Sequence, residues 1–261
     1  IGKTKAGRIT TLGRGGSDYT ASIVGAAISA DEIQIWSDVD GIMSTDPNIV
    51  RNARSIEKVS FAEASELAYF GAKILHPKTI LPAMNKNIPV RVLNSFNPRS
   101  KGTLIVNKSG KSRQTVKAIA YKNNTTLISV ESTRMLGAYG FLARIFEIFG
   151  KYRKSVDVIS TSEVSVSLTV DNGKDVNSIL NELKQISDVE VLKNKSIICV
   201  VGEGMKGTTG IISKTFGILE RNKINIEMIS QGASKINITF IVDGKDTNKA
   251  VRLLHKEYFG K

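Results

Sequence analysis

A glycine-rich loop near the amino terminus carries the strongest chemical signal in the sequence. Residues 10–22 read TTLGRGGSDYTAS, in which three glycines surround a single cation, Arg14. Glycine permits positive φ and close approach of the backbone to a ligand, and a guanidinium holds carboxylates or phosphates through paired hydrogen bonds. Ser17 or Asp18 can cap the helix expected next, which leaves backbone N–H groups facing an anion. The loop fits an anion site, and a plain turn before a capped helix fits the spacing equally well.

A second polar segment, residues 36–46, reads WSDVDGIMSTD and follows an expected strand. Ligands of open α/β sheets bind at the carboxyl ends of strands, where Ser37 and Asp38 stand. Asp38, Asp40 and Asp46 loosely resemble a cation-binding loop, but no glutamate completes a calcium pattern. An aspartate-rich turn with its corner at Asp40 explains the same residues. Ser37 and Asp38 are therefore candidate contacts for a nucleotide, and no metal held by the protein itself is predicted.

The segment FGAKILHP, residues 70–77, contains the next candidate groups. Lys73 follows a Phe-Gly break in a helical pattern and is suited to neutralise a phosphate. His76 is one of only two histidines, the other being His255, and it precedes a proline. Neither a nucleophile elbow nor a Cys/His pairing accompanies it, so a histidine-based triad is not supported. We interpret His76 as a turn residue.

Alternating strand and helix signals over residues 1–108 place these segments in an α/β layer fold. Hydrophobic periodicity predicts helices at 21–30 and 61–70 and strands at 32–36, 88–93 and 103–106. Residues 7–12 are the candidate for a strand before the glycine-rich loop. A polar stretch ends the alternation, and we predict a linker at residues 109–115.

The remainder of the chain, residues 116–261, is built twice. With a constant offset of 70, residues 127–170 match residues 197–240 without a gap, and Gly140 corresponds to Gly210. Each copy predicts strand, glycine-containing loop, helix, strand, turn, strand and helix. This is the βαββαβ plan of small ferredoxin-like domains. Two copies predict a tandem pair of such domains and are too few for a solenoid.

The first repeat carries charges suited to a free amino acid. A loop over residues 132–142 leads into a helix N-terminus, where N–H groups can hold a carboxylate. Asp157 and Glu163 lie on a strand and turn opposite this loop and can hold an ammonium group. In the second repeat Ala233 stands in place of Glu163, so only the first copy keeps the full set of charges. Dimerisation by both copies is the alternative explanation of the duplication.

The overall charge and the cysteine content bear on the partners and the compartment. Lysine and arginine number 37 against 24 acidic residues, a formal net charge of +13. The lysines are scattered without interleaved aromatic residues, so we predict no nucleic-acid partner. No apolar run reaches membrane-spanning length, so no membrane association is predicted. The single cysteine, Cys199, rules out a disulfide within the chain and fits a reducing compartment. The predicted location is the cytoplasm, or the plastid stroma in a plant or alga.

In combination, these segments resemble the aspartate kinases, also called aspartokinases. The motifs that carry the resemblance are TTLGRGGSDYTAS, WSDVDGIMSTDP, FGAKILHP and the paired repeats, and together they cover essentially all 261 residues. The blocks STRMLGAYGFLARIF and SVDVISTSEVSVSLT resemble the lysine-sensitive, monofunctional branch. The implied fold is α/β: the carboxyl-terminal part of an amino-acid kinase (carbamate-kinase-like) three-layer domain, then two ferredoxin-like βαββαβ ACT domains. By the family pattern, a first ACT domain of about 125–194 is inserted in a second one, formed by about 116–124 and 195–261.

The resemblance also implies a reaction and its ligands. The family transfers the γ-phosphoryl group of Mg-ATP to the side-chain carboxylate of L-aspartate, giving 4-phospho-L-aspartate for lysine, threonine and methionine synthesis. L-Lysine is the expected allosteric inhibitor, and homodimers or larger assemblies are expected to form through the ACT domains. Phosphoryl transfer depends mainly on positioning and charge neutralisation, which suits the residue types present.

The positions in the family motifs imply individual roles. By the resemblance, Arg14 binds a carboxylate of the substrate aspartate, and Asp18 binds the substrate's amino group or makes a positioning hydrogen bond. The resemblance also implies that Arg14 and Asp18 are the catalytic residues. The implied aspartate-binding residues are Arg14, Gly15, Gly16, Ser17 and Asp18. The implied ATP-binding residues are Ser37, Asp38, Gly41, Met43 and Lys73. The implied lysine-binding residues are Met135, Ala138, Gly140, Phe141, Leu142, Val156, Asp157, Thr161, Ser162 and Glu163. Met43 and Ala138 stand where some relatives carry Tyr and Ser.

One family motif has no counterpart in this sequence. The amino-terminal KFGGTS segment, whose lysine stabilises the transferring phosphoryl group in the family, does not occur here. We therefore expect the chain to hold half of the active site and the whole regulatory region of a longer kinase. The alternative is a non-catalytic regulatory or assembly subunit that binds an amino acid and dimerises.

Overall fold

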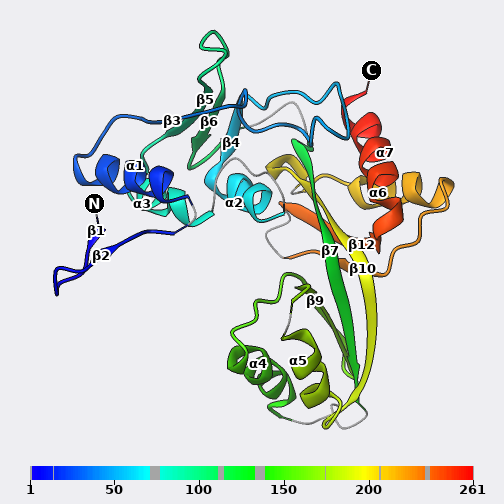
Figure 1. Cartoon of the computed structure of the whole chain (residues 1–261). Coiled ribbons are helices and arrows are strands. Elements are labelled where there is room, and N and C mark those ends of the chain that lie inside the picture. Colours follow the sequence, from blue (N-terminus) through cyan, green and yellow to red (C-terminus); the bar gives the residue numbers. More distant parts are fainter. Residues whose placement is uncertain are drawn as a thin grey trace.

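Two sheets organise the chain in a computed structural model (Figure 1) that describes residues 2–13, 15–70, 77–110, 115–132, 139–173, 175–205, 207–232 and 236–260. The first sheet belongs to the amino-terminal part, residues 2–110, and the second joins both repeats. Strands β7 (Ala118–Glu131) and β10 (Asp188–Val201) run from the middle of the molecule to its lower end in Figure 1. The fold is a mixed α/β fold, as predicted.

The amino-terminal part holds a four-stranded sheet in the order β3-β5-β6-β4. β3 pairs in parallel with β5, and β4 in parallel with β6, while β5 and β6 are antiparallel. These strands are β3 (Ile33–Ser37), β4 (Lys58–Ser60), β5 (Val90–Asn94) and β6 (Thr103–Val106). The strands β1 (Gly2–Lys3) and β2 (Ile9–Thr10) form a separate short hairpin.

Helices cover this sheet and carry the loops of interest. They are α1 (Gly16–Ala27), α2 (Phe61–Tyr69) and α3 (Leu81–Asn85), with the 3-10 turn η1 (Pro77–Ile80) before α3. α1 packs against β3 and α3, and α2 packs against β4 and β6. A capping box at Ser60 and Glu63 starts α2, since each donates a backbone N–H to the side chain of the other.

Three local predictions for this part were wrong. The first helix begins at Gly16 instead of residue 21, and its N-cap is Gly15 in the left-handed region, so neither Ser17 nor Asp18 caps it. The strand expected at residues 7–12 is reduced to β2. The sequence did not indicate β4, because three residues are too few to show an alternating pattern.

The second sheet is antiparallel and has the strand order β11-β12-β10-β7-β9-β8. Its shorter strands are β8 (Ile159–Thr161), β9 (Ser165–Asp171), β11 (Met228–Ser230) and β12 (Asn237–Asp243). The helices that accompany them are α4 (Phe141–Lys151), α5 (Val176–Leu183), α6 (Ile211–Arg221) and α7 (Thr247–Phe259), with 3-10 turns η3 (Glu203–Met205) and η4 (Gly244–Asp246). The order β7-α4-β8-β9-α5 followed by β10-α6-β11-β12-α7 confirms the predicted duplication.

Backbone details repeat at the same offset of 70. Asn124 and Asn194 have φ of 60° and 56°, inside β7 and β10, and the pairing of these two strands shifts register there. Arg153 and Lys223 have φ of 51° and 56°, just beyond the ends of α4 and α6. Left-handed non-glycine residues are uncommon. Two matched pairs of them show that the repeats share their backbone path.

Apolar packing differs between the repeats. In the second repeat β10 is buried on both faces: Ile197, Cys199 and Val201 join the core of the amino-terminal part, and Ile198 and Val200 join the core under α6 and α7. The first repeat has its own core beneath α4 and α5. Burial raises the pKa of Cys199 to about 12, so this thiol is core filler, as predicted. Within the described ranges, no helix combines the length and apolar character needed to cross a membrane.

Candidate functional site

The glycine-rich loop enters α1 through two left-handed residues. Gly13 has φ 76° and Gly15 has φ 72°, a conformation that glycine adopts without steric cost. Gly16 N donates to Gly13 O. Ser17 and Asp18 lie in the first turn of α1, where the helix itself supplies no acceptors for the N–H groups. Ser17 Oγ donates to Asp18 Oδ1 at 3.2 Å. The loop thus presents backbone donors and a carboxylate side by side.

Small side chains let α1 lie close to β3 and thereby fix this loop. A Cβ added to Gly25 would lie 2.5 Å from the side chain of Ile33, so only glycine fits the contact. Ser22 is buried and its Oγ accepts a hydrogen bond from Ala83 N of α3 at 3.2 Å. The run of small residues in the sequence is therefore a packing requirement of the helix that carries Ser17 and Asp18.

Ser37 and Asp38 follow at the carboxyl end of β3, as predicted. Ser37 O accepts from Ser95 N at 2.8 Å, and Ser37 Oγ donates to Asp38 Oδ1 at 3.1 Å. Asp38 is exposed. Gly41, with φ 103°, lies so close to Thr103 that a Cβ would be 2.5 Å from Oγ1. These contacts leave two adjacent polar side chains, Ser37 and Asp38, at the open end of a strand, where a nucleotide is commonly bound.

The remaining aspartates of this segment are used within the protein. Asp40 Oδ1 accepts hydrogen bonds from the side-chain amides of Asn94 and Asn97. Asp46 Oδ1 accepts from the backbone N–H and the side chain of Asn48, which is an Asx turn. In the part of the chain that the structure describes, no three acidic, histidine or cysteine side chains form a metal-binding group.

Ser44 fastens this segment to the second repeat. Ser44 O accepts from Ile119 N of β7 at 2.8 Å, and Ser44 Oγ accepts from Arg54 N at 2.9 Å. His255 Nε2 of α7 lies 2.9 Å from the same Oγ. Burial, together with the charge of Arg54, lowers the pKa of His255 and so favours the neutral imidazole, which shares one hydrogen bond with the Ser44 hydroxyl. Three segments distant in sequence, which carry Ser44, Ile119 and His255, therefore meet at one buried serine.

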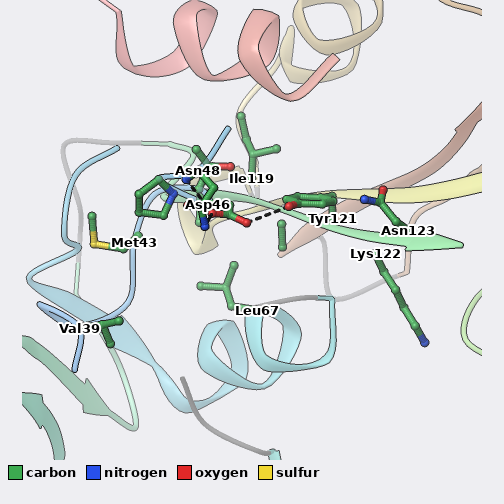
Figure 2. Close-up of a pocket in the computed structure, with 13 residues that line it drawn as sticks. Val39, Met43, Asp46, Asn48, Leu67, Ile119, Tyr121, Lys122 and Asn123 are labelled. Carbon is green, nitrogen blue, oxygen red and sulfur yellow. Dashed lines mark hydrogen bonds between the residues drawn. The ribbon is translucent and has the colours of Figure 1, made fainter. Parts of the chain in front are cut away.

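A cleft of about 570 Å³ lies between residues 39–48 and the start of β7 (Figure 2). Met43 lines it on one side, and Tyr121 and Lys122 line it on the other. Tyr121 Oη donates to Asp46 Oδ2 at 2.8 Å. Burial and this carboxylate raise the pKa of Tyr121 to about 12, so the phenol stays a donor. The cleft lies between the candidate nucleotide segment and β7 of the second sheet.

The candidate effector residues lie at the start of α4 and along the β8–β9 hairpin of the first repeat, with Asp157 beside Thr169 and Glu163 at the hairpin tip. Gly140 is the left-handed N-cap of α4 with φ 81°, matched by Gly210 with φ 82° at α6. Phe141 and Val156 pack against the same apolar core, whereas Leu142 is exposed. This arrangement directs the N–H groups at the start of α4 away from the core.

The turn after β8 contributes exposed polar groups. Thr161 ends β8, and Ser162 Oγ lies 2.7 Å from Ser165 Oγ and accepts from Ser165 N at 3.1 Å. Glu163 is exposed at the tip of the turn. Its carboxylate is therefore open to a charged ligand.

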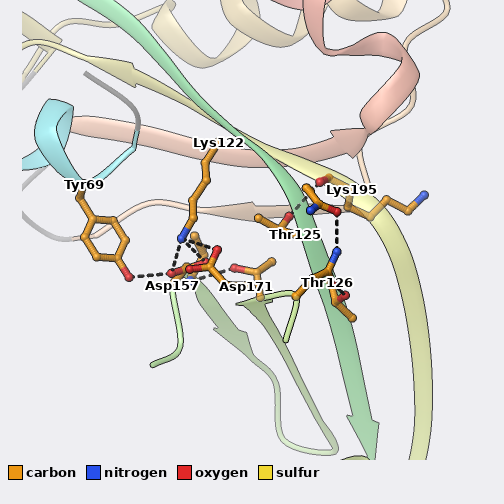
Figure 3. A network of polar contacts seen from close by, with 11 residues as sticks. Tyr69, Lys122, Thr125, Thr126, Asp157, Asp171 and Lys195 are labelled. Atoms are coloured by element: carbon orange, nitrogen blue, oxygen red, sulfur yellow. Dashed lines mark hydrogen bonds and ion pairs between the residues drawn. The ribbon is translucent and has the colours of Figure 1, made fainter. Parts of the chain in front are cut away.

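Asp157 holds an ammonium group that belongs to the protein itself (Figure 3). Both its oxygens lie 2.9 Å from Lys122 Nζ, and Oδ1 also accepts from Tyr69 Oη at 2.8 Å. Lys122 Nζ lies 2.8 Å from Asp171 Oδ1 as well. Burial opposes the charge on Lys122, but hydrogen bonds to Asp171 and Asp157 outweigh it and raise the lysine pKa. Burial and the bond to Asp157 raise the pKa of Tyr69, so it remains a donor.

Sequence reasoning identified Asp157 but none of its partners. Lys122 is one of many scattered lysines, Asp171 ends a strand, and Tyr69 belongs to α2 in the other part of the chain. Only the register of β7 against β9, which pairs Thr125 with Asp171, brings Lys122 near both carboxylates. No motif or spacing in the sequence signals this arrangement.

Some of the predicted residues cannot be placed. Four of them lie outside the described residues: Arg14, Lys73, Met135 and Ala138. His76 and Ala233 also lie outside them. Between the described residues of the glycine-rich loop and the pair Ser37 and Asp38, no hydrogen bond or ion pair is found. α1 and β3 nevertheless pack together, so both segments belong to one layered unit.

Comparison with known proteins defines the class of this chain. Residues 1–94 match the amino acid kinase family, and residues 128–184 and 198–258 match the ACT domain. The chain is therefore an amino acid kinase segment followed by ACT domains. It is 46% identical over 260 residues to "Aspartokinase 3, chloroplastic" of Arabidopsis thaliana, and this match covers 96% of this chain and 46% of that protein. It is 43% identical over 267 residues to "Lysine-sensitive aspartokinase 3" of Escherichia coli, covering 99% and 59%. The chain belongs to the aspartokinase family.

Solved structures of this family superpose on this chain along nearly its whole length. Aspartokinase III of E. coli in complex with aspartate and ADP gives a TM-score of 0.87 at 43% identity, covering 99% of this chain and 59% of that chain. The same enzyme in complex with lysine and aspartate gives 0.83 at 44% identity, with the same coverage. Aspartate kinase of Clostridium acetobutylicum gives 0.89 at 35% identity, covering 98% and 61%. The chain spans about half the length of the curated relatives it matches.

Proposed function

We propose that this chain forms part of an aspartate kinase that is inhibited by lysine. The kinase would transfer the γ-phosphoryl group of Mg-ATP to the β-carboxylate of L-aspartate and release 4-phospho-L-aspartate. Relatives of this name match 96% or more of the chain, and a similar solved structure holds aspartate and ADP. The product would enter lysine, threonine and methionine synthesis.

The substrate residues follow the sequence prediction. Arg14 and Asp18 would contact the charged groups of aspartate, with Gly15, Gly16 and Ser17 around them. The left-handed glycines and the first turn of α1 support this assignment, since they offer backbone donors to a carboxylate. The nucleotide would meet Ser37, Asp38, Gly41, Met43 and Lys73. Of these, the adjacent hydroxyl and carboxylate at the end of β3 are the best supported.

One observation carries the regulatory proposal: Asp157 is a buried carboxylate built to bind an ammonium group. Only 3% of its side chain is exposed, yet it holds Lys122 Nζ with both oxygens. By the sequence prediction, Glu163 and the N–H groups at Gly140 would also contact the effector, and Glu163 lies at the other end of the β8–β9 hairpin from Asp157. The other effector residues would be Met135, Ala138, Phe141, Leu142, Val156, Thr161 and Ser162.

The domain division, the assembly and the compartment are further parts of this proposal. A first ACT domain of about 125–194 would interrupt a second one of about 116–124 and 195–261. The register shift at Asn124 and Asn194 supports these bounds. Exposed apolar side chains on α4, Leu142 and Phe146, support association of two or more copies through the ACT domains. The location would be the cytoplasm, or the plastid stroma in a plant or alga.

Isothermal titration with L-lysine tests the regulatory proposal. The chain should bind lysine, and Asp157→Asn should weaken binding by about tenfold or more, because a charged hydrogen bond is lost. Glu227→Gln is the matched control, since Glu227 occupies the position of Asp157 in the second repeat, and it should leave the affinity unchanged. Equal losses in both variants would contradict a specific site at Asp157.

Kinase activity needs a separate measurement. ADP release should depend on aspartate and fall with added lysine when the chain is assayed together with the amino-terminal half of a related aspartokinase. Lysine binding without aspartate-dependent turnover under these conditions would favour the alternative, a non-catalytic regulatory or assembly subunit.

A further inference from the structure

Lys122 is shared between two carboxylates of unequal exposure. Its Nζ lies 2.9 Å from both oxygens of Asp157 and 2.8 Å from Asp171 Oδ1 (Figure 3). The side chain of Asp157 is 3% exposed, that of Lys122 is 23% exposed and that of Asp171 is 58% exposed. One partner of Lys122 is thus enclosed and the other faces solvent.

The charges in this cluster do not balance. Two carboxylates face one ammonium group, which leaves the cluster with one excess negative charge. A second ammonium group would therefore be attracted, whereas a second anion would be repelled. The enclosed carboxylate is the stronger site for a cation, because solvent screens its charge less than that of Asp171.

We propose that Lys122 occupies Asp157 when no effector is bound, and that an ammonium group of the effector takes Asp157 while Lys122 remains paired with Asp171. This inference rests on the proposed effector site at Asp157. Lys122 would then be an internal competitor of the effector, and the strength of its pair with Asp157 would set the effector concentration that the protein senses. Asp171 lowers the cost of the exchange, since Lys122 keeps one partner throughout.

The neighbours of Lys122 show which contacts such an exchange would change. Asp157 also accepts from Tyr69 Oη of α2, so a new cation at Asp157 would alter a contact with the amino-terminal part, residues 2–110, which we call the kinase part. Lys122 follows Tyr121, which bonds to Asp46, and Ile119, which bonds to Ser44 O. β7 therefore carries Lys122 together with Tyr121 and Ile119, the two residues that bind the candidate nucleotide segment.

The second repeat contains a matched cluster that serves as a control. Lys195 Nζ lies 2.8 Å from Glu227 Oε1 and 3.2 Å from Asp243 Oδ2. Glu227 and Asp243 precede β11 and end β12, as Asp157 and Asp171 precede β8 and end β9. No hydrogen bond to the kinase part is found for these three residues in the described part of the chain. A change at Lys195 thus tests for general effects of removing such a lysine.

The experiment is isothermal titration of the whole chain with L-lysine, with folding checked by circular dichroism. Lys122→Met should raise the affinity by about fivefold, and Asp171→Asn should lower it by about threefold, as expected for partly exposed ion pairs. Lys122→Arg should restore an affinity near the original, because it keeps the cation. Lys195→Met should stay within about twofold of the original. Should Lys122→Met fold poorly, Lys122→Gln provides the same test.

The opposite signs for Lys122→Met and Asp171→Asn distinguish the proposal from a merely structural role. Weaker or unchanged binding in a folded Lys122→Met variant would overturn it. Tighter binding in Asp171→Asn would overturn the role given to Asp171. These failures would leave the effector site standing if the original chain binds lysine and Asp157→Asn does not. If neither the original chain nor Lys122→Met binds lysine, both proposals fail.

Discussion

The two repeats contact the kinase part, residues 2–110, through connections of opposite character. At the second repeat, Lys117 Nζ lies 2.7 Å from Glu63 Oε2, and the two side chains are 4% and 0% exposed. Glu63 Oε1 also accepts from Glu203 N at 2.7 Å, so η3 is bound to the start of α2. At the first repeat, the link is the group of Tyr69, Asp157 and Lys122, in which the lysine side chain is 23% exposed.

Their difference lies in how freely each connection can change partners. A fully buried ion pair cannot lose one member without leaving an uncompensated charge in the interior, which is strongly destabilising. Lys122 is partly exposed and can leave Asp157 at a smaller cost, because it keeps a second partner, the exposed carboxylate of Asp171. The second repeat is therefore the fixed attachment, and the first repeat is the one whose contact with α2 can respond to a ligand.

The largest effect should come from breaking the fixed attachment with Lys117→Met. Glu63 would remain buried without its cation, at a cost of about 3–5 kcal/mol in the free energy of unfolding. Urea denaturation followed by circular dichroism measures this loss. Fluorescence of Trp36, the only tryptophan, reports the kinase part separately. We expect the two transitions to coincide in the original chain and to separate in the variant.

Lys122→Met is the matched control for this prediction. It removes a lysine from the responsive connection, where Asp157 keeps the hydrogen bond from Tyr69. The loss should therefore be smaller, about 1–3 kcal/mol, and both transitions should still coincide. Similar costs for the two variants would show that the connections do not differ in kind.

The fixed attachment and the responsive one were not equally visible in the sequence. The glycine-rich loop, the end of β3 and the duplication were predictable, because glycine spacing, strand alternation and a constant offset are local patterns. Asp157 was found through its place in a repeated block. Its partners Lys122 and Tyr69 lie 35 and 88 positions away, and only strand register and domain packing bring them together.

The same limit applies to the buried attachment. A helix was predicted at residues 61–70, but the pattern did not show that Glu63 on this helix is fully buried against Lys117 and η3. Nothing in a helical pattern distinguishes an exposed glutamate from one that a distant lysine covers. Likewise the helix start at Gly15 was missed, since side-chain capping is the commoner local pattern and left-handed glycine replaced it here.

A smaller effect should appear in the pH dependence of the free energy of unfolding, through the hydrogen bond between Ser44 and His255. The pKa of His255 is lowered below its ordinary value of 6.5 by burial and by Arg54. The unfolded chain therefore takes up a proton first as the pH falls. Stability contributed by neutral His255 is present above about pH 6.5 and is lost toward and below its folded-state pKa, by at most about 1.4 kcal/mol per pH unit.

Urea midpoints between pH 7.5 and 5.5 provide the measurement, with His255→Gln as the control. Glutamine does not titrate, so the variant should show a shallower decline than the original chain over this range. Parallel declines in both proteins would assign the pH dependence to other groups and remove His255 from the account.

The smallest effect should come from Tyr69→Phe, which removes the hydroxyl that joins α2 to the first repeat. Asp157 keeps Lys122, so no buried charge is left without a partner, and the free energy of unfolding should fall by about 0.5–1 kcal/mol. The transitions seen by Trp36 fluorescence and by circular dichroism should still coincide, because the pair of Glu63 and Lys117 is intact. Lysine affinity should rise by about twofold at most, since one competitor for Asp157 Oδ1 is gone. A loss above about 2 kcal/mol, or separated transitions, would mean that the first repeat is as firmly attached as the second, and that the contact at Tyr69 is structural instead of responsive.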